Sequence, residues 1–392
     1  MKVLHVRDHS LPISSGYSYR SQSIVQHQKR LGLGPVVLTS LKHGSRADAQ
    51  ERIDDVTQYR TGAPAAAPPF VRELLLMQRL AARITEVARQ EQVSLIHAHS
   101  LLLNGLPALM VARSLGLPVV YEVRRFWEDA AVSHGTFAQN SLRYGVSRAL
   151  ETAVLRRVDH VVTICEGIRR EAARRRIRPI GSQWCRTASI RPGSSVLRGP
   201  LASPTSSASA PARSLVTSGR SAPTKAYRSW SMPLGTSCGR SPGSQLLLVG
   251  SGRDESAVRT AVRSAGRAVL FPGRLPQEQV RGLYTLLDVL VLPRRRIRLT
   301  ELVTPPKPLE AMASAKPILT SDVGEHAELI TEGDTKLLFA AEDREALVVQ
   351  AVRLGTEPQL RHRLGSRARV VAADRTWDQM VARYLPLYAA AC

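Results

Sequence analysis

Short apolar strands alternate with amphipathic helices along two long parts of the chain, and this alternation restricts the fold more than any other feature. In the first part the strands read KVLHV, PVVLTS, SLIHAHS, PVVYEVR and HVVTIC. In the second part they read QLLLVGSG, AVLFPGR, DVLVLP and KPILTS. Strands joined through helices form parallel βαβ units. The sequence therefore predicts an α/β protein with two doubly wound sheets.

A stretch between these two parts lacks the alternation. Residues 196–221 are rich in Ser, Ala, Pro and Arg and contain few residues that could form a core. We expect a first domain over residues 1–174, an aberrant and disordered segment over 175–242, and a second, incomplete domain with a closing helix over 243–392. The sheet of the second domain would then lack one of its inner strands.

The formal net charge of +23 is unevenly distributed. Thirteen Lys and Arg and no acidic residue lie between Ala172 and Arg253, so this segment supplies more than half of the excess. The rest of the charge fits a solvated basic surface or a membrane-facing patch, and it does not indicate a nucleic-acid site.

Cysteine usage and hydropathy favour a cytoplasmic protein. The four cysteines are far apart and lack the paired spacing of a zinc site or a disulfide framework. No apolar run is long enough for a membrane span, and the first residues lack the pattern of a signal peptide.

Polar residues gather where strands of the first sheet are expected to end, which is the edge where α/β sheets bind ligands. His97 and His99 lie on one strand, and we expect one of them to face the core and the other the ligand, with His97 the structural one. Glu122 and Arg124 either pair with each other or contact substrate, and both alternatives stay open.

Several longer motifs resemble glycosyltransferase family 4, in the bacterial branch found with exosortase and exopolysaccharide loci. They are HVRDHSLPISSGYSYRS, IHAHS, VVYEVRRFWEDAAVSHG, TICEGI and RLTELVTPPKPLEAMA. The resemblance extends over most of residues 1–171 and 245–392. It implies the GT-B fold, in which two Rossmann-like domains face a cleft and a C-terminal helix closes back on the first domain.

The resemblance also implies roles for individual residues. Gly16 would lie in a loop that approaches the donor phosphate and the acceptor, where a side chain would block the backbone. His99 would be the catalytic histidine beside the transferred sugar. Glu310 would hold the nucleotide ribose through two hydroxyl hydrogen bonds.

Other matched residues would handle the diphosphate. Gly324 would turn the backbone beneath it, with backbone N–H groups available to an anion. Lys307 and Arg298 would neutralise the leaving group without a metal. The family often carries two glutamates with seven residues between them, whereas eight separate Glu301 from Glu310, so a contact between Glu301 and the donor sugar stays open.

The implied activity is that of a retaining glycosyltransferase. It would move a sugar from a nucleotide-diphosphate donor to a saccharide or lipid-linked acceptor in exopolysaccharide synthesis, with no cofactor, no metal and no nucleic-acid partner. Peripheral contact with the inner membrane is also expected. The alternatives are a nucleotide-sugar 2-epimerase of the same fold and a basic protein that binds nucleic acid or membranes.

The middle segment is best interpreted as a translation out of frame. If the third base of each codon is read with the first two of the next, IGSQWCRTASIRPGS can encode RVTVVPNGVDPARF. In the same frame SGRSAPTKAYRSWSMP can encode GSFSAYEGLPILVDA. These strings resemble the linker and the donor-facing loop of the family, so this exact chain is expected to be impaired or inactive. A true flexible linker is the alternative.

Overall fold

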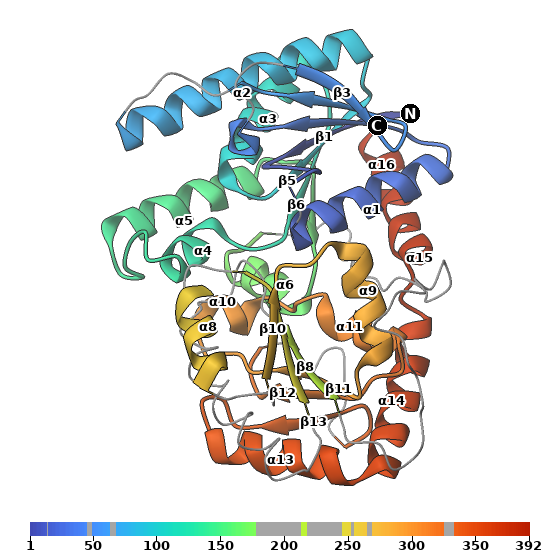
Figure 1. Cartoon of the computed structure of the whole chain (residues 1–392). Coiled ribbons are helices and arrows are strands. Elements are labelled where there is room, and N and C mark those ends of the chain that lie inside the picture. Colours follow the sequence, from blue (N-terminus) through green and yellow to red (C-terminus); the bar gives the residue numbers. More distant parts are fainter. Residues whose placement is uncertain are drawn as a thin grey trace. The chain divides into compact units, whose positions relative to one another are not determined.

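The computed structural model describes residues 1–13, 15–44, 49–62, 68–177, 213–217, 245–251, 255–264, 269–324 and 333–392. The chain divides into two compact units, each built on its own sheet (Figure 1). The first unit comprises Met1–Arg186 together with Trp377–Cys392, and the second comprises Thr187–Thr376. The expected α/β class with two Rossmann-like domains is confirmed.

The first sheet has seven strands in the order β3-β4-β2-β1-β5-β6-β7. The strands are β1 (Lys2–Arg7), β2 (Gly34–Thr39), β3 (Ala49–Ile53), β4 (Val56–Arg60), β5 (Leu95–His99), β6 (Val119–Val123) and β7 (His160–Thr163). All neighbouring strands are parallel except β3 and β4. The chain passes from β1 to β2 on one side and later returns to β5 on the other. A switch point for ligands therefore lies at the carboxyl ends of β1 and β5.

The hairpin of β3 and β4 is an addition that the sequence did not lead us to expect. Asp54 and Asp55 join the two strands with φ angles of 49° and 60°. Two central residues with positive φ are the signature of the tight type I′ turn. The β-branched and aromatic residues of VTQYR were the available signal, but an Asp-Asp pair marks such a turn less clearly than Asp-Gly would.

Helices cover the first sheet, and the end of the chain joins them. They are α1 (Gly16–Arg30), η1 (Leu41–His43), α2 (Pro69–Glu91), α3 (Leu102–Leu115), α4 (Trp127–Ser133), α5 (Leu142–Leu155), α6 (Glu166–Arg174), α15 (Trp377–Ala382) and α16 (Tyr384–Ala391). Helix α15 lies beside α1, and α16 contacts β6 (Figure 1). The C-terminal helices thus close back on the first unit, as expected.

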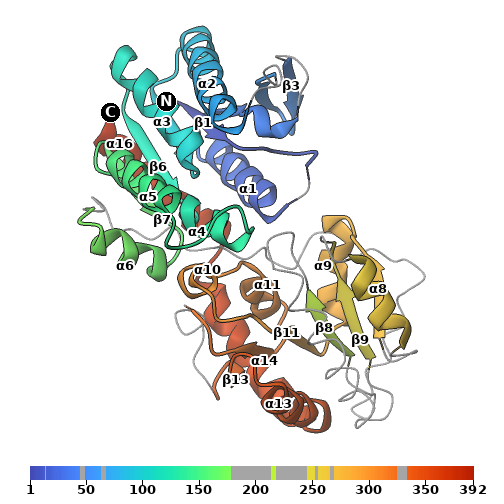
Figure 2. The same cartoon turned by 90° about the vertical axis from the view of Figure 1, so that its left-hand side faces the viewer.

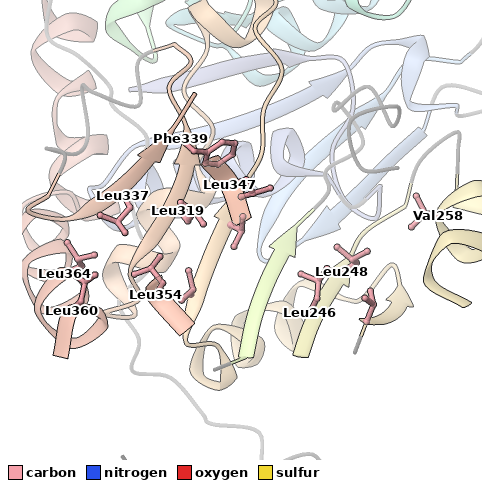
Figure 3. Packing of buried hydrophobic residues seen from close by; sticks show 13 residues of the cluster. Leu246, Leu248, Val258, Leu319, Leu337, Phe339, Leu347, Leu354, Leu360 and Leu364 are labelled. Carbon is pink, nitrogen blue, oxygen red and sulfur yellow. The ribbon is translucent and has the colours of Figure 1, made fainter. Parts of the chain in front are cut away.

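The second sheet is fully parallel, with six strands in the order β10-β9-β8-β11-β12-β13. Its strands are β8 (Arg213–Thr217), β9 (Gln245–Val249), β10 (Val269–Gly273), β11 (Val289–Leu292), β12 (Ile318–Ser321) and β13 (Lys336–Phe339). Its helices are α8 (Glu255–Ser264), α9 (Gln277–Leu286), α10 (Arg298–Leu302), α11 (Lys307–Ala313), α13 (Arg344–Thr356) and α14 (Pro358–Ala373). Apolar side chains from β9, β12, β13, α13 and α14 form one continuous core (Figure 3).

Two expectations about the middle of the chain are wrong. The second sheet does not lack its inner strand, because Arg213–Thr217 forms β8 between β9 and β11 (Figure 2). The sequence RSLVT contains only two large apolar residues, too few for a periodicity to reveal a strand. The first unit also extends past residue 174, since Arg175 stacks 3.7 Å from the ring centre of Phe126 and its Nη2 lies 2.6 Å from a carboxylate oxygen of Glu128. The disorder expected around 180–240 otherwise concerns residues outside the described ranges.

Candidate functional site

Three histidines form a buried cluster in the first unit. His5 comes from β1, and His97 and His99 come from β5; the exposed fraction of each is 0%. The rings of His97 and His99 stack with their centres 4.4 Å apart. The expectation that one faces the core and the other the ligand is therefore wrong. Residues two apart on a strand point to the same face of the sheet.

His99, the expected catalytic residue, has a partner at each ring nitrogen. Nη2 of Arg124 lies 2.8 Å from its Nδ1, and Nδ1 of His5 lies 2.9 Å from its Nε2. Its carbonyl oxygen accepts a hydrogen bond from Asn104. Burial, together with the charge of Arg124, lowers the pKa of His99 well below its ordinary value, so the imidazole is neutral.

Glu122 and Arg124 pair with each other. Nε of Arg124 donates to Oε1 of Glu122 over 2.8 Å, and both side chains are buried. Arg20 donates to the same oxygen, and the Tyr384 hydroxyl donates to Oε2. Burial alone would raise the pKa of Glu122, but Arg124 and Arg20 hold it well below its ordinary value. The carboxylate therefore stays ionised.

The ring nitrogens of the three histidines take part in a network of hydrogen bonds. Within the described ranges, His5, His97 and His99 are one group whose ligand atoms all lie within 4.8 Å, close enough for a metal ion. Every ring nitrogen except Nε2 of His97 nevertheless has a hydrogen-bond partner. A metal would have to displace these partners, and the neighbouring guanidinium of Arg124 disfavours a cation.

The second unit places Glu310 and Lys307 on α11, in the segment that follows β11. The Tyr284 hydroxyl donates to Oε2 of Glu310 over 2.8 Å. Burial lowers the pKa of Lys307 to about 8, with the charge of Arg294 acting in the same direction and that of Glu310 against it. Arg298 begins α10 in the same segment and is partly exposed.

Glu301 and Gly324 contact each other. The Gly324 N–H donates to Oε2 of Glu301 over 3.0 Å, and Nη1 of Arg296 lies 2.9 Å from Oε1. Gly324 has a φ of +60°, and a Cβ there would lie 2.1 Å from the carbonyl oxygen of Thr300. Glycine is required by the packing of the chain itself. The N–H of Gly324 is committed to Glu301, and the amides of 325–332 lie outside the described residues.

Gly16 stands at the start of α1, exposed to solvent. The side chain of Ser15 caps this helix by accepting from the Ser18 N–H. A Cβ built on Gly16 would meet no atom within 4 Å. The packing of the chain therefore gives no steric reason for a glycine at this position. That Gly16 leaves room for the donor phosphate and the acceptor stays a prediction.

Sequence reasoning missed the residues that surround the histidines. Gln28 contacts His5, and Tyr388 contacts both Gln28 and His97. The available signal was the pair of tyrosines in ARYLPLYAA, which lie four residues apart on the otherwise apolar helix α16. Residues at this spacing share one face of a helix.

Two family models match the chain. The model described as "Glycosyl transferase 4-like domain" matches residues 15–180, and "Glycosyl transferases group 1" matches residues 232–357. A GDP-mannose-dependent alpha-mannosyltransferase of Mycolicibacterium smegmatis is 26% identical over 390 residues, which cover 98% of this chain and 97% of that protein. A GDP-mannose-dependent phosphatidylinositol monomannoside mannosyltransferase of Corynebacterium glutamicum is 29% identical over 146 residues, 36% of this chain and 37% of that protein.

Solved structures agree at the level of the fold. Sucrose-phosphate synthase from Thermosynechococcus elongatus has a TM-score of 0.77 at 19% identity and covers 100% of this chain and 98% of its own. Anabaena HepE in complex with UDP and glucose has a TM-score of 0.69 at 15% identity and covers 99% of this chain and 100% of its own. The chain is a glycosyltransferase with the GT-B fold. The two matches together support a glycosyltransferase of the family 4 type.

Within the described ranges, no helix combines the length and the apolar character that a membrane span needs.

Proposed function

We propose that this glycosyltransferase is a retaining enzyme that moves a sugar from a nucleotide diphosphate to a saccharide or lipid-linked acceptor. We place it in exopolysaccharide synthesis, in the branch associated with exosortase loci. The observation that carries the proposal is the pairing of Glu310 with Tyr284, with Lys307 in the same first turn of α11, the helix that comes after the carboxyl end of β11. Ligands of α/β sheets bind at this edge.

Glu310 has the chemistry to hold a ribose. A carboxylate can accept hydrogen bonds from two hydroxyl groups, and the Tyr284 hydroxyl donates to Oε2 of this one. Tyr284 fixes the orientation of the carboxylate before a nucleotide arrives. Such preorganisation reduces the entropy that is lost on binding.

Lys307 and Arg298 would stabilise the departing diphosphate. Burial lowers the pKa of Lys307 to about 8, so its charged form is less stable in this site than in water. A diphosphate nearby would raise that pKa and make the charge permanent. Stabilisation of developing charge by fixed cations needs no metal ion. Gly324 would act indirectly, through its bond with Glu301.

His99 is proposed to lie beside the transferred sugar, with Gly16 in the loop that approaches the phosphate and acceptor. Since both ring nitrogens of His99 are occupied, contact with a sugar requires Arg124 or His5 to release its hydrogen bond. The acceptor hydroxyl would attack from the face that the diphosphate leaves. No side-chain nucleophile is assigned.

Donor identity is proposed from the relatives. Two of them are named as dependent on GDP-mannose, and another is a 2-deoxystreptamine N-acetyl-D-glucosaminyltransferase of Streptomyces fradiae, 33% identical over 31% of this chain and 28% of its own. GDP-mannose and UDP-N-acetylglucosamine are therefore the first donors to test. Release of free sugar without any acceptor would instead indicate the 2-epimerase alternative, and salt-sensitive oligonucleotide binding would indicate the nucleic-acid alternative. The family models and these relatives favour neither alternative.

Peripheral contact with the inner membrane is supported by an exposed apolar surface in the first unit. Leu142, Val146 and Leu150 repeat every four residues on α5, and Leu142 is 86% exposed. The adjoining α2 exposes further apolar side chains, and an ion pair between Arg143 and Glu73 links the two helices. Apolar side chains beside arginines suit an anionic bilayer surface. Co-sedimentation with vesicles that contain anionic lipid, compared between wild type and Leu142→Ser/Val146→Ser, tests this contact.

The proposed frame shift is now confined to a shorter stretch. Arg175 and Ile177 pack into the first unit, and the second family match begins at residue 232. The out-of-frame stretch would therefore extend from about residue 178 to about 231. Since β8 is present, impaired activity would arise from the missing donor loop and not from a missing strand. Resequencing the coding DNA tests this, and an intact reading frame through the stretch would remove the proposal.

A further inference from the structure

Seven buried side chains of the first unit form a circuit of polar contacts, in which every contact except that between His97 and Glu122 is a hydrogen bond. Nη2 of Arg124 contacts Nδ1 of His99 at 2.8 Å, and Nε2 of His99 contacts Nδ1 of His5 at 2.9 Å. Nε2 of His5 then contacts Oε1 of Gln28 at 2.7 Å.

The circuit continues through the C-terminal helix α16. Nε2 of Gln28 donates to the Tyr388 hydroxyl over 2.8 Å, and that hydroxyl lies 2.6 Å from Nδ1 of His97. Nε2 of His97 makes no hydrogen bond but faces Oε2 of Glu122 at 3.5 Å, and Oε1 of Glu122 accepts from Arg124 at 2.8 Å, so the circuit closes through an electrostatic contact.

The charge of Arg124 decides which group is the donor and which the acceptor in each contact from Arg124 to Gln28. A guanidinium can only donate, so Nδ1 of His99 must accept. Because the pKa of each of the three histidines is lowered, mainly by burial, each ring is neutral and carries one proton. His99 therefore donates from Nε2 to His5. His5 donates from its own Nε2 to Gln28.

In the contacts from Gln28 to Glu122, the donors and acceptors are decided by the side-chain amide of Gln28. Gln28 donates its N–H to the oxygen of Tyr388, so the phenol donates its proton to Nδ1 of His97. His97 then carries its proton on Nε2, toward Glu122, which as a carboxylate can only accept. Arg124 can only donate and Glu122 can only accept, and the assignment between them agrees with both. No contact of the circuit therefore pairs two donors or two acceptors.

We propose that Gln28 and Tyr388 are positioning residues that fix the protonation order of the three histidines and hold His99 as the neutral tautomer protonated on Nε2. The C-terminal helix is in this way part of the machinery around His99. The proposal rests on the proposed function only for the role of His99. The protonation order itself can be measured whether or not the chain transfers a sugar.

The test uses the full chain with ¹⁵N-labelled histidine and long-range ¹H–¹⁵N spectra between pH 6 and 8. His5, His97 and His99 should each show a neutral ring with the proton on Nε2, without titration in this range. Spectra of His5→Gln, His97→Gln and His99→Gln assign the signals.

Gln28→Glu reverses one donor of the circuit. A carboxylate at this position accepts from Tyr388, so the phenol can no longer donate to His97, which must then take a proton on Nδ1. The signals of His97 should therefore change from the pattern of a ring protonated on Nε2 alone to a pattern with a proton on Nδ1. Gln58→Glu, at a buried glutamine of β4 outside the circuit, should leave all three patterns unchanged.

Tyr388→Phe removes the hydroxyl and keeps the ring. The Nδ1 resonance of His97 should move by several ppm, as for a nitrogen that loses a hydrogen-bond donor, while Tyr59→Phe should leave it in place. A wild-type His99 protonated on Nδ1, or a His97 that stays unprotonated on Nδ1 in Gln28→Glu, would overturn the proposal. These outcomes do not depend on activity, so a chain that transfers no sugar would refute the proposed function and leave the protonation order decided.

Discussion

The hydroxyl of Tyr388 lies 2.6 Å from Nδ1 of His97, although 291 residues separate the two in the chain. The contact ties the last helix to the centre of the first sheet. Tyr388→Phe leaves Gln28 and His97 each with one unsatisfied buried group, which costs about 1–3 kcal/mol per group. We expect a lower midpoint of urea unfolding for the first unit. Tyr59→Phe, which removes one bond to Glu91 at a similarly buried ring, should have a smaller effect.

His99→Ala should slow transfer more than it weakens binding of the sugar donor, because its proposed place is beside the reacting sugar. His97→Ala is the matched control, since it removes an equally buried histidine from the same face of β5. Turnover and donor affinity are measured for both variants. If both lose only folding stability, the two histidines are core residues and His99 has no catalytic role.

Glu151 should make the stability of the first unit depend on pH. Burial, with the nearby charge of Glu128, raises the pKa of Glu151 from 4.5 to about 8. The folded state therefore keeps a proton that the unfolded state releases above about 4.5. Stability is full below that pH and falls as the pH rises through about 8. Glu151→Gln should flatten the decline of the melting temperature between pH 5 and 9, although it loses one bond to the Trp127 N–H. An unchanged slope would mean that Glu151 has an ordinary pKa.

Gly324 and Gly16 should respond differently to replacement by alanine. At Gly324 the φ of +60° and a Cβ 2.1 Å from the Thr300 carbonyl oxygen predict a loss of at least about 2 kcal/mol in the free energy of unfolding. At Gly16 the space is open, so stability should stay the same or rise by about 0.4–1 kcal/mol. A stable Gly16→Ala chain with reduced transfer would support the role of this loop in substrate approach. Full transfer by that variant would remove it.

The sequence predicted the fold well where strands and helices carried a clear apolar period, as in KVLHV on β1 and DVLVLP on β11. It did not predict β8, because a strand of five residues in the middle of a Ser-rich stretch has no period of its own. Position at a strand end identified His99, Glu122 and Arg124 as polar neighbours. The partners Gln28 and Tyr388 come from distant helices, and only the three-dimensional fold brings them together.

In the second unit, the role of Glu301 could likewise not be predicted from the number of residues between it and Glu310. Their separation by eight residues left the role of Glu301 open, and the structure joins Glu301 to Gly324 and Arg296. The sequence does not show at which residue a short helix begins, because local capping interactions decide this. The spacing of two glutamates therefore does not predict which face of the helix each carboxylate occupies.

The central claim is that Glu310 holds the nucleotide of a sugar donor. Calorimetric titration with GDP-mannose and UDP-N-acetylglucosamine tests it most directly, in a chain whose residues 178–231 are restored to the expected frame. At least one donor should bind, and Glu310→Gln should weaken that binding by about 1.5–3 kcal/mol, the range for a hydrogen bond to a charged group. Glu357→Gln, at an exposed carboxylate of the same unit, should bind like the parent chain. Undiminished binding by Glu310→Gln, or a restored chain that binds neither donor, would contradict the account.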